Sequence, residues 1–315
     1  MPDDIELPGR FKAVFISPHL DDAVLSCGGT LAQLAASDPV LVVNVFTHYP
    51  NRYHRGAINA GQERHAEERN AARYLGYRSL NLGETDAIFR KTTRGSARRL
   101  FLPPRLGDID SLGKLSARIE ECLSGIEYET LYLPMGIGWH VDHMLCHLAT
   151  RHYLGRPNVL LYEDAPYCLV PNAARYRVHE LGRAPGGADL VPPSLAGLFG
   201  DWLVTSRSYL STAPVASIRP YPLRLAANMV VAGYLGQLMA RHLRPSSDGR
   251  RYRLEALSRD VTATFDRKIS ACYLYESQIN EFFFDRSDFV ERYSRYSETL
   301  GKPRRQYERF WQMRG

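Results

Sequence analysis

Two short polar clusters contain the residues best suited to chemistry. The first, HLDD at residues 19–22, lies where an apolar stretch, residues 13–16, gives way to a helical pattern. The second, HVDH at residues 140–143, follows a similar apolar stretch at residues 130–135. Imidazole nitrogens and carboxylate oxygens are zinc ligands and general acids or bases. Each cluster alone is explained as well by a helix start, with an aspartate cap beside a solvated histidine.

The two clusters are more informative together than apart. His140 and His143 are three residues apart, so on one helical turn they share a face. Asp142 can support one of these imidazoles through its ring N–H. With His19 and Asp22, the chain then has enough nitrogen and oxygen ligands for a three-ligand zinc site with an open water position. Such mixed sites also accept Fe²⁺ and other divalent ions. The pair of clusters therefore predicts a catalytic metal centre.

The elements that must position these clusters alternate between strand and helix patterns. Strands are expected at residues 13–17, 40–46, 77–82, 130–135 and 158–162. Helices are expected at residues 22–36, 62–75, 115–123 and 144–153. This alternation predicts an α/β fold, a Rossmann-like and mostly parallel sheet flanked by helices. Because ligands bind at the carboxyl ends of parallel strands, both clusters are expected at one edge of the sheet.

The second half of the chain has a different pattern. Residues 183–194 (RAPGGADLVPPS) resemble a linker, and helices are expected beyond it at residues 223–242, 253–284 and 304–312. We therefore predict a core at residues 1–170 and a mainly helical C-terminal elaboration, residues 171–315, packed on it. Residues 90–107 are basic and interrupted by prolines, which favours a flap or surface loop that shapes access to the site.

Composition narrows the classes of function. The chain is 44% hydrophobic and 23% charged, which is typical of a globular protein, and its net charge of +6 permits an anionic partner. The positive charge has no accompanying nucleic-acid motif, so no nucleic acid is expected. Five scattered cysteines without CxxC favour free thiols and a cytoplasmic location. The longest uncharged stretch, residues 225–240, is too short for a membrane span. Oligomeric assembly is left open.

The motifs resemble one known family. SPHLDDAVLSCGG and HVDH are similar to the zinc-dependent PIG-L or LmbE-like deacetylases, which include N-acetylglucosaminyl-phosphatidylinositol deacetylases, mycothiol and bacillithiol pathway deacetylases and antibiotic-tailoring enzymes. Residues 64–76, 82–86 and 266–280 also fit the family pattern. The resemblance implies a metal-dependent hydrolase that removes an acyl group, expected to be acetyl, from an amide nitrogen. The implied substrate is an N-acylated amino sugar or glycosylated metabolite.

The resemblance also implies a role for each polar residue. It places Zn²⁺ on three ligands, His19, Asp22 and His143. Asp21 is then the general base that takes a proton from water. His140 stabilises the oxyanion and protonates the leaving amine, and Asp142 orients His140.

Two other classes of function stay open at this point. A metal-dependent hydratase or lyase would add the same water to a double bond of a small metabolite, and a non-catalytic protein would keep only the fold. The chain also departs from the family at Leu20, Ala23 and Tyr275, where proline, glutamate and histidine are usual. Leu20 and Ala23 are not ligands, so the metal site should persist. Tyr275 bears on proton transfer or sugar recognition.

Overall fold

A computed structural model describes residues 9–50, 60–90, 104, 106–183, 197–210, 221–242, 252–301 and 304–314. The predicted flap at residues 90–107 and the linker at residues 183–194 lie largely outside this part of the chain.

One eight-stranded sheet organises the described residues, with the order β3-β2-β1-β4-β5-β8-β7-β6. The first five strands are β1 (Arg10–Ser17), β2 (Val40–Asn44), β3 (Arg78–Asn81), β4 (Glu127–Pro134) and β5 (Val159–Tyr162). All neighbouring pairs among them are parallel. Every residue of β2 is buried, as a β-branched run covered on both faces should be. The predicted Rossmann-like arrangement is confirmed.

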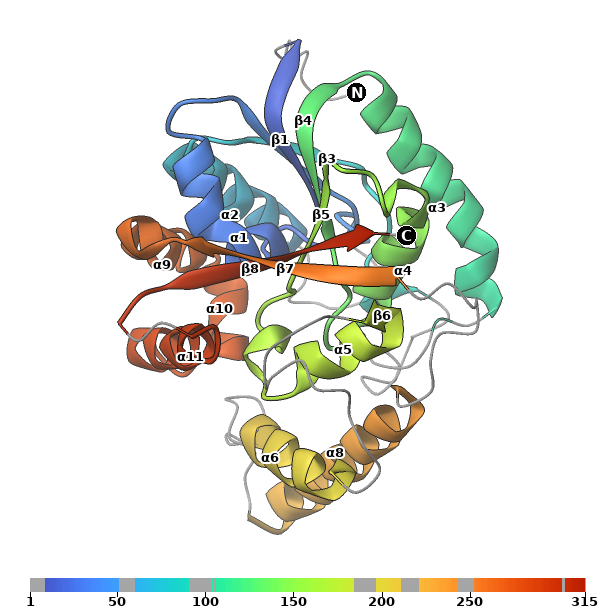
Figure 1. The fold of residues 1–315 in the computed structure, drawn as a ribbon, viewed down its shortest axis with the longest axis vertical. Coiled ribbons are helices and arrows are strands. Elements are labelled where there is room, and N and C mark those ends of the chain that lie inside the picture. The colour runs from blue at the N-terminus through green and yellow to red at the C-terminus, as the bar shows by residue number, and fades with distance from the viewer. Residues whose placement is uncertain are drawn as a thin grey trace.

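Helices cover both faces of the sheet. The α-helices are α1 (Asp22–Leu34), α2 (Ala60–Leu75), α3 (Leu106–Ser124), α4 (Val141–Ala149), α5 (Ala173–Leu181), α6 (Leu198–Leu210), α8 (Tyr221–His242), α9 (Phe265–Cys272), α10 (Glu276–Phe282) and α11 (Arg286–Thr299). Short 3₁₀ turns are η1 (Ala87–Phe89), η3 (Arg151–Tyr153), η4 (Tyr167–Leu169) and η6 (Thr262–Thr264). Figure 1 shows α1, α2 and α9 on one side of the sheet and α3 and α4 on the other. Among the described helices, none is both long and apolar enough to cross a membrane.

The last strands correct two sequence-based expectations. Residues 253–260 and 307–312 were expected to be helical, but they belong to β7 (Tyr252–Asp260) and β8 (Tyr307–Arg314). These strands pair antiparallel, β8 also pairs with β5, and β6 (Gly182–Arg183) adds a short edge. The sequence of β7 contains residues with high helix propensity, which is why a helix was predicted. Pairing with the rest of the sheet overrides this weak propensity. The predicted boundary near residue 170 stays a prediction, and strands from both sides of it share this sheet.

A buried ion pair between Lys268 of α9 and Glu308 of β8 connects these two elements to α1. Helix α1 is kinked at Cys27, and the Glu308 carboxylate accepts hydrogen bonds from the backbone N–H groups of Gly29 and Thr30, each at 2.9 Å. Lys268 Nζ lies 2.8 Å from Glu308 Oε1, with both side chains almost fully buried. The carboxylate thus replaces hydrogen-bond partners that the kink removes, and its charge is balanced by the lysine.

Replacing Lys268 by methionine is expected to lower the free energy of unfolding by about 3–5 kcal/mol, because Glu308 would stay buried without its counter-charge. Urea denaturation measures this change. The double variant Lys268→Met/Glu308→Gln removes both charges and should recover part of the loss. A single variant as stable as the parent protein would show that the pair does not fasten these elements.

Candidate active site

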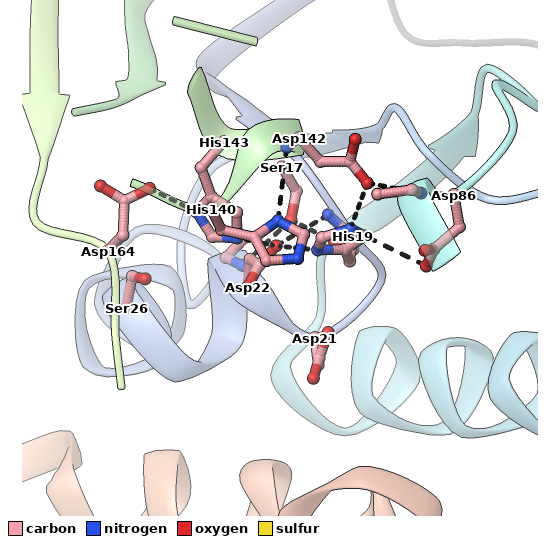
Figure 2. Close-up of polar contacts among 12 residues, drawn as sticks. Ser17, His19, Asp21, Asp22, Ser26, Asp86, His140, Asp142, His143 and Asp164 are labelled. Carbon is pink, nitrogen blue, oxygen red and sulfur yellow. Dashed lines mark hydrogen bonds and ion pairs between the residues drawn. The ribbon is translucent and has the colours of Figure 1, made fainter. Parts of the chain in front are cut away.

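Both polar clusters lie at the same edge of the sheet because their strands are neighbours. HLDD joins β1 to α1, and HVDH follows β4 and begins α4. Since β1 and β4 pair in parallel, their carboxyl ends are side by side. The ring centroids of His19, His140 and His143 are 5.2–5.5 Å apart, and Figure 2 shows them grouped around Asp22.

One carboxylate oxygen lies between two imidazole nitrogens. Asp22 Oδ2 is 2.9 Å from His19 Nδ1 and 3.2 Å from His143 Nε2. Neighbouring ligand atoms of a tetrahedral zinc ion, with bonds of roughly 2.0–2.1 Å, are about 3.3 Å apart. Asp22 Oδ2 therefore lies at nearly this spacing from one nitrogen of each histidine. Two groups bring one potential ligand atom from each residue to within 4.8 Å of one another: His19 with His140 and His143, and His19 with Asp86 and Asp142.

A second carboxylate orients each of the two histidines. His19 Nε2 lies 3.0 Å from Asp142 Oδ2, and His143 Nδ1 lies 2.7 Å from Asp164 Oδ1. Asp164 is held in turn by the backbone N–H groups of Gly136 and Ile137, which donate to its Oδ2 at 2.7 and 2.9 Å. Carboxylates that accept the far ring N–H are a regular feature of metal-binding histidines. They turn the remaining nitrogen of each ring toward Asp22.

The electrostatics of the site favour a cation. Burial acts to raise the pKa of Asp22, but His143 and His19 outweigh it and hold this pKa well below its usual value. Burial also acts to lower the pKa of His143, yet Asp22 and Asp164 raise it to about 9. Several buried aspartates surround the histidines, namely Asp21, Asp22, Asp86, Asp142 and Asp164. This excess of negative charge, which draws protons onto the imidazoles, fits a divalent metal ion.

Asp21 points away from its neighbour Asp22. Figure 2 shows the carboxylate of Asp21 apart from the histidine group. Its Oδ1 lies 3.6 Å from Arg64 of α2, which also lies 3.9 Å from Asp86 Oδ2. Burial and the charge of Asp22 raise the pKa of Asp21, whereas Arg64 lowers it. The two adjacent aspartates thus occupy different environments.

His140 caps α4 with its own side chain. Its Nδ1 accepts the backbone N–H of Asp142 at 3.3 Å, which assigns the ring proton to Nε2. Burial and the nearby His19 lower its pKa to about 3. The ring of Tyr167 stacks on His140 with centroids 6.5 Å apart. Gly138 leaves room for this tyrosine, because a Cβ added at Gly138 would lie 2.3 Å from the Tyr167 Cγ.

Sequence reasoning missed several partners of the site. Asp142 was expected to orient His140, but its carboxylate contacts His19 and, at 2.5 Å, the guanidinium of Arg90. Asp164 lies just after β5, and this place in the sequence was a usable signal for the same edge of the sheet. Arg64 belonged to the family-like segment, but nothing in the sequence paired it with Asp21.

Three further polar residues near these elements have other contacts. Glu163 accepts hydrogen bonds from Tyr296, Arg309 and Trp311 and so supports the core. His147 of α4 lies with its Nδ1 3.1 Å from the Pro134 carbonyl oxygen. The ring of Tyr49 lies against Arg64, with the guanidinium 4.8 Å from the ring centroid.

Tyr275 belongs to a buried network around Glu68. The Glu68 carboxylate on α2 accepts hydrogen bonds from Tyr275, Ser79 and Tyr77. Asn44 also donates to it at 3.1 Å. Tyr275 is 2% exposed, and its hydroxyl therefore serves this network. Burial raises the pKa of Glu68 to about 7, although its hydrogen bonds act in the opposite direction.

The protein is expected to lose stability as the pH rises through 7. The unfolded state releases the Glu68 proton near pH 4.5, whereas the folded state holds it to about pH 7. The contribution of Glu68 to the free energy of unfolding is therefore fully present below pH 4.5 and falls as the pH rises from 4.5 to 7. Above pH 7 the loss amounts to about 3 kcal/mol. Urea unfolding at pH 5 and pH 8 measures this loss, which Glu68→Gln should reduce. An unchanged pH dependence in the variant would exclude Glu68 as its source.

These features define an open α/β protein with a buried histidine and aspartate site of the metal-binding type. Residues 14–154 match the sequence model of the GlcNAc-PI de-N-acetylase family, PIG-L. The resemblance noted from the motifs is thus confirmed.

One relative is similar to this chain in sequence, and two solved structures are similar to it in fold. A 168-residue stretch is 32% identical to 2'-N-acetylparomamine deacetylase from Streptomyces fradiae; it covers 50% of this chain and 58% of that protein. The fold is similar to that of the A40926 pseudoaglycone deacetylase Dbv21, with a TM-score of 0.59, 20% identity and 96% of each chain covered. The zinc-inhibited form of teicoplanin deacetylase Orf2 also has a TM-score of 0.59 and 20% identity, over 96% of this chain and 97% of that one.

Proposed function

We propose that this protein is a metal-dependent hydrolase that removes an acetyl group from an amide nitrogen of an amino sugar or glycosylated metabolite. The observation that carries the proposal is the position of Asp22 Oδ2 between His19 Nδ1 and His143 Nε2. The deacetylase activities named for the paromamine relative and for the fold relatives support the same reaction. The substrate class rests on the N-acetylated amino sugar in the name of the paromamine relative.

The proposed metal is zinc, held by His19, Asp22 and His143. The zinc-inhibited form of teicoplanin deacetylase Orf2 supports zinc as an ion that such a fold binds. Asp142 and Asp164 would keep the two histidines in the binding orientation. When bound, zinc lowers the pKa of water toward about 7 and polarises the amide carbonyl. The grouping of His19 with Asp86 and Asp142 is less suitable, because Asp142 already accepts from the Ala87 N–H and pairs with Arg90.

The remaining residues of the site would move protons. Asp21 is the proposed general base, because it is a buried carboxylate next to the ligand Asp22 but turned away from the ligand group. The lowered pKa of His140 supports a neutral imidazole whose Nε2–H donates to the developing oxyanion. This differs from the role that the family resemblance implied, in which His140 also protonates the leaving amine. The proton that Asp21 takes from water is then returned to the amine as the C–N bond breaks, which completes the hydrolysis.

Product analysis tests the proposed reaction. The zinc-loaded protein is incubated with a panel of N-acetylated amino sugars, including 2'-N-acetylparomamine and N-acetylglucosaminides, and the products are identified by mass spectrometry. Acetate and a free primary amine in equal amounts are expected. A product that gains water without losing a fragment would identify a hydratase instead. Binding without any product across the panel would favour a non-catalytic protein.

A further inference from the structure

Helices α6 and α8 form a hairpin, hereafter the α6–α8 hairpin, that exposes an unusual amount of apolar surface. Among the described residues, eight of the twelve exposed large hydrophobic side chains belong to it: Phe199, Leu203, Val204, Tyr221, Leu223, Leu225, Met229 and Val230. Met229 is 68% exposed, and Val230 and Phe199 are each 66% exposed. Single exposed apolar residues are ordinary, but a concentration of them on one element marks a binding surface.

The hairpin is attached to the body of the protein by its other side. Trp202 Nε1 donates to the Ala232 carbonyl at 2.6 Å and so joins the two helices. Asp201 accepts from Tyr176 and pairs with Arg175, both on α5. Met239 is buried against Tyr176 and Trp139 in a small core cluster. Figure 1 shows α6 and α8 at one end of the molecule, beyond α5. The apolar surface therefore lies on an element that is anchored to the enzyme.

The exposed charges that the structure describes on the hairpin are positive, because the carboxylate of α6, Asp201, is largely buried and pairs with Arg175 of α5. The chain contains 34 acidic residues, yet none lies between Trp202 and Ser247. The same stretch contains five arginines, at positions 207, 219, 224, 241 and 244, and the structure describes the side chains of Arg207 and Arg224. Arg207 is exposed on α6, and Arg224 lies 5.2 Å from the ring of Tyr221 on α8. Arg207 and Arg224 thus lie on the same two helices as the exposed apolar side chains, whereas Asp201 is turned toward α5.

This combination distinguishes between possible occupants of the surface. A second copy of the chain, related by a two-fold axis, would bring the same arginine-bearing surface against itself. The like charges of Arg207 and Arg224 would then oppose association, because the carboxylate of Asp201 is already paired with Arg175 of α5. An anionic lipid surface matches both kinds of side chain, because its headgroups attract arginine and its acyl region accepts apolar side chains. We propose that the α6–α8 hairpin docks the protein onto an anionic membrane surface.

In this arrangement the hairpin lies in the headgroup region without spanning the bilayer. Met229, Val230 and Leu223 enter the boundary between headgroups and acyl chains, and Arg207 and Arg224 contact lipid phosphates. The hairpin residues that do so are separate from His19, Asp22 and His143. The docking surface is therefore an addition to the proposed deacetylase site and does not depend on it.

Vesicle co-sedimentation of the full chain tests the proposal. The vesicles are phosphatidylcholine alone, or phosphatidylcholine with an equal amount of phosphatidylglycerol. The parent protein should bind the anionic vesicles, and the binding should weaken as salt is added. Met229→Asp/Val230→Asp should reduce the partition coefficient at least about tenfold, and Arg224→Gln about fivefold. Tyr74→Asp and Arg295→Gln are matched controls, because both residues are exposed on helices outside the hairpin.

The other outcomes overturn the proposal. Equal binding of neutral and anionic vesicles would show that charge does not contribute to docking. Binding by the Met229→Asp/Val230→Asp variant equal to that of the parent protein would show that the hairpin is not the docking surface. Sedimentation velocity identifies the remaining occupant: a dimer that this variant abolishes, in a protein that binds neither vesicle, would assign the surface to a second copy. Circular dichroism checks that each variant is folded, and because the substituted side chains are exposed, thermal unfolding should be unchanged.

Discussion

Replacing His143 by alanine is expected to abolish high-affinity metal binding and to lower turnover by about 10³-fold or more. The substitution removes the nitrogen that lies 3.2 Å from Asp22 Oδ2 and leaves Asp164 without its imidazole partner. Loss of a metal that supplies about 4 kcal/mol of transition-state stabilisation corresponds to a rate effect of this size. Metal content by mass spectrometry and acetate release measure the two effects separately.

His147→Ala is the matched control for this substitution. His147 is also a buried histidine of α4, but its ring faces the Pro134 carbonyl. This variant should lose some stability while it keeps one equivalent of metal and most of its turnover. A His143→Ala protein that keeps a full equivalent of metal would show that the ligand set is wrong. The alternative group of His19, Asp86 and Asp142 would then be the first to test.

Replacing Asp21 by asparagine should lower kcat by about 10²–10⁴-fold while the metal stays bound. The amide has nearly the shape of the carboxylate but does not take a proton at neutral pH. Since Asp21 contacts Arg64 and points away from the ligand group, its loss should leave His19 and His143 in place. The measurement pairs kcat with metal content in the same preparation.

The neighbouring residue provides the comparison for Asp21→Asn. Asp22→Asn should lose metal as well as turnover, because Asp22 Oδ2 is the atom shared by both histidines. The two variants should thus fail in different ways although they are adjacent in the chain. Undiminished turnover in Asp21→Asn would exclude this residue as the general base.

The parallel part of the fold and the meeting of the two clusters were accessible from the sequence. Buried β-branched strands and helical spacing identify β1, β2 and β4, and parallel pairing brings HLDD next to HVDH. Strands β7 and β8 were not accessible, because β8 carries Glu308 and Arg309 at buried positions that look solvent-exposed in sequence. Their burial depends on the distant partners Lys268 and Glu163.

The hydrogen-bond partners within the site were the least predictable feature. Asp142 sits beside His140 in sequence, yet its carboxylate contacts His19, a residue 123 positions away. Asp164 contacts His143 only because β5 pairs with β4 and ends at the same edge. Residue type and spacing identify which groups can bind a metal, whereas side-chain direction decides which of them meet.

Metal titration of the metal-free protein with zinc, followed by acetate and free amine release from an accepted N-acetylated amino sugar, tests the central claim most directly. Hydrolysis is expected to rise in proportion to zinc up to one equivalent per chain, with acetate and amine formed in equal amounts. Hydrolysis at an unchanged rate in the metal-free protein would contradict the account. So would a full equivalent of bound zinc that produces no acetate from any substrate in the panel.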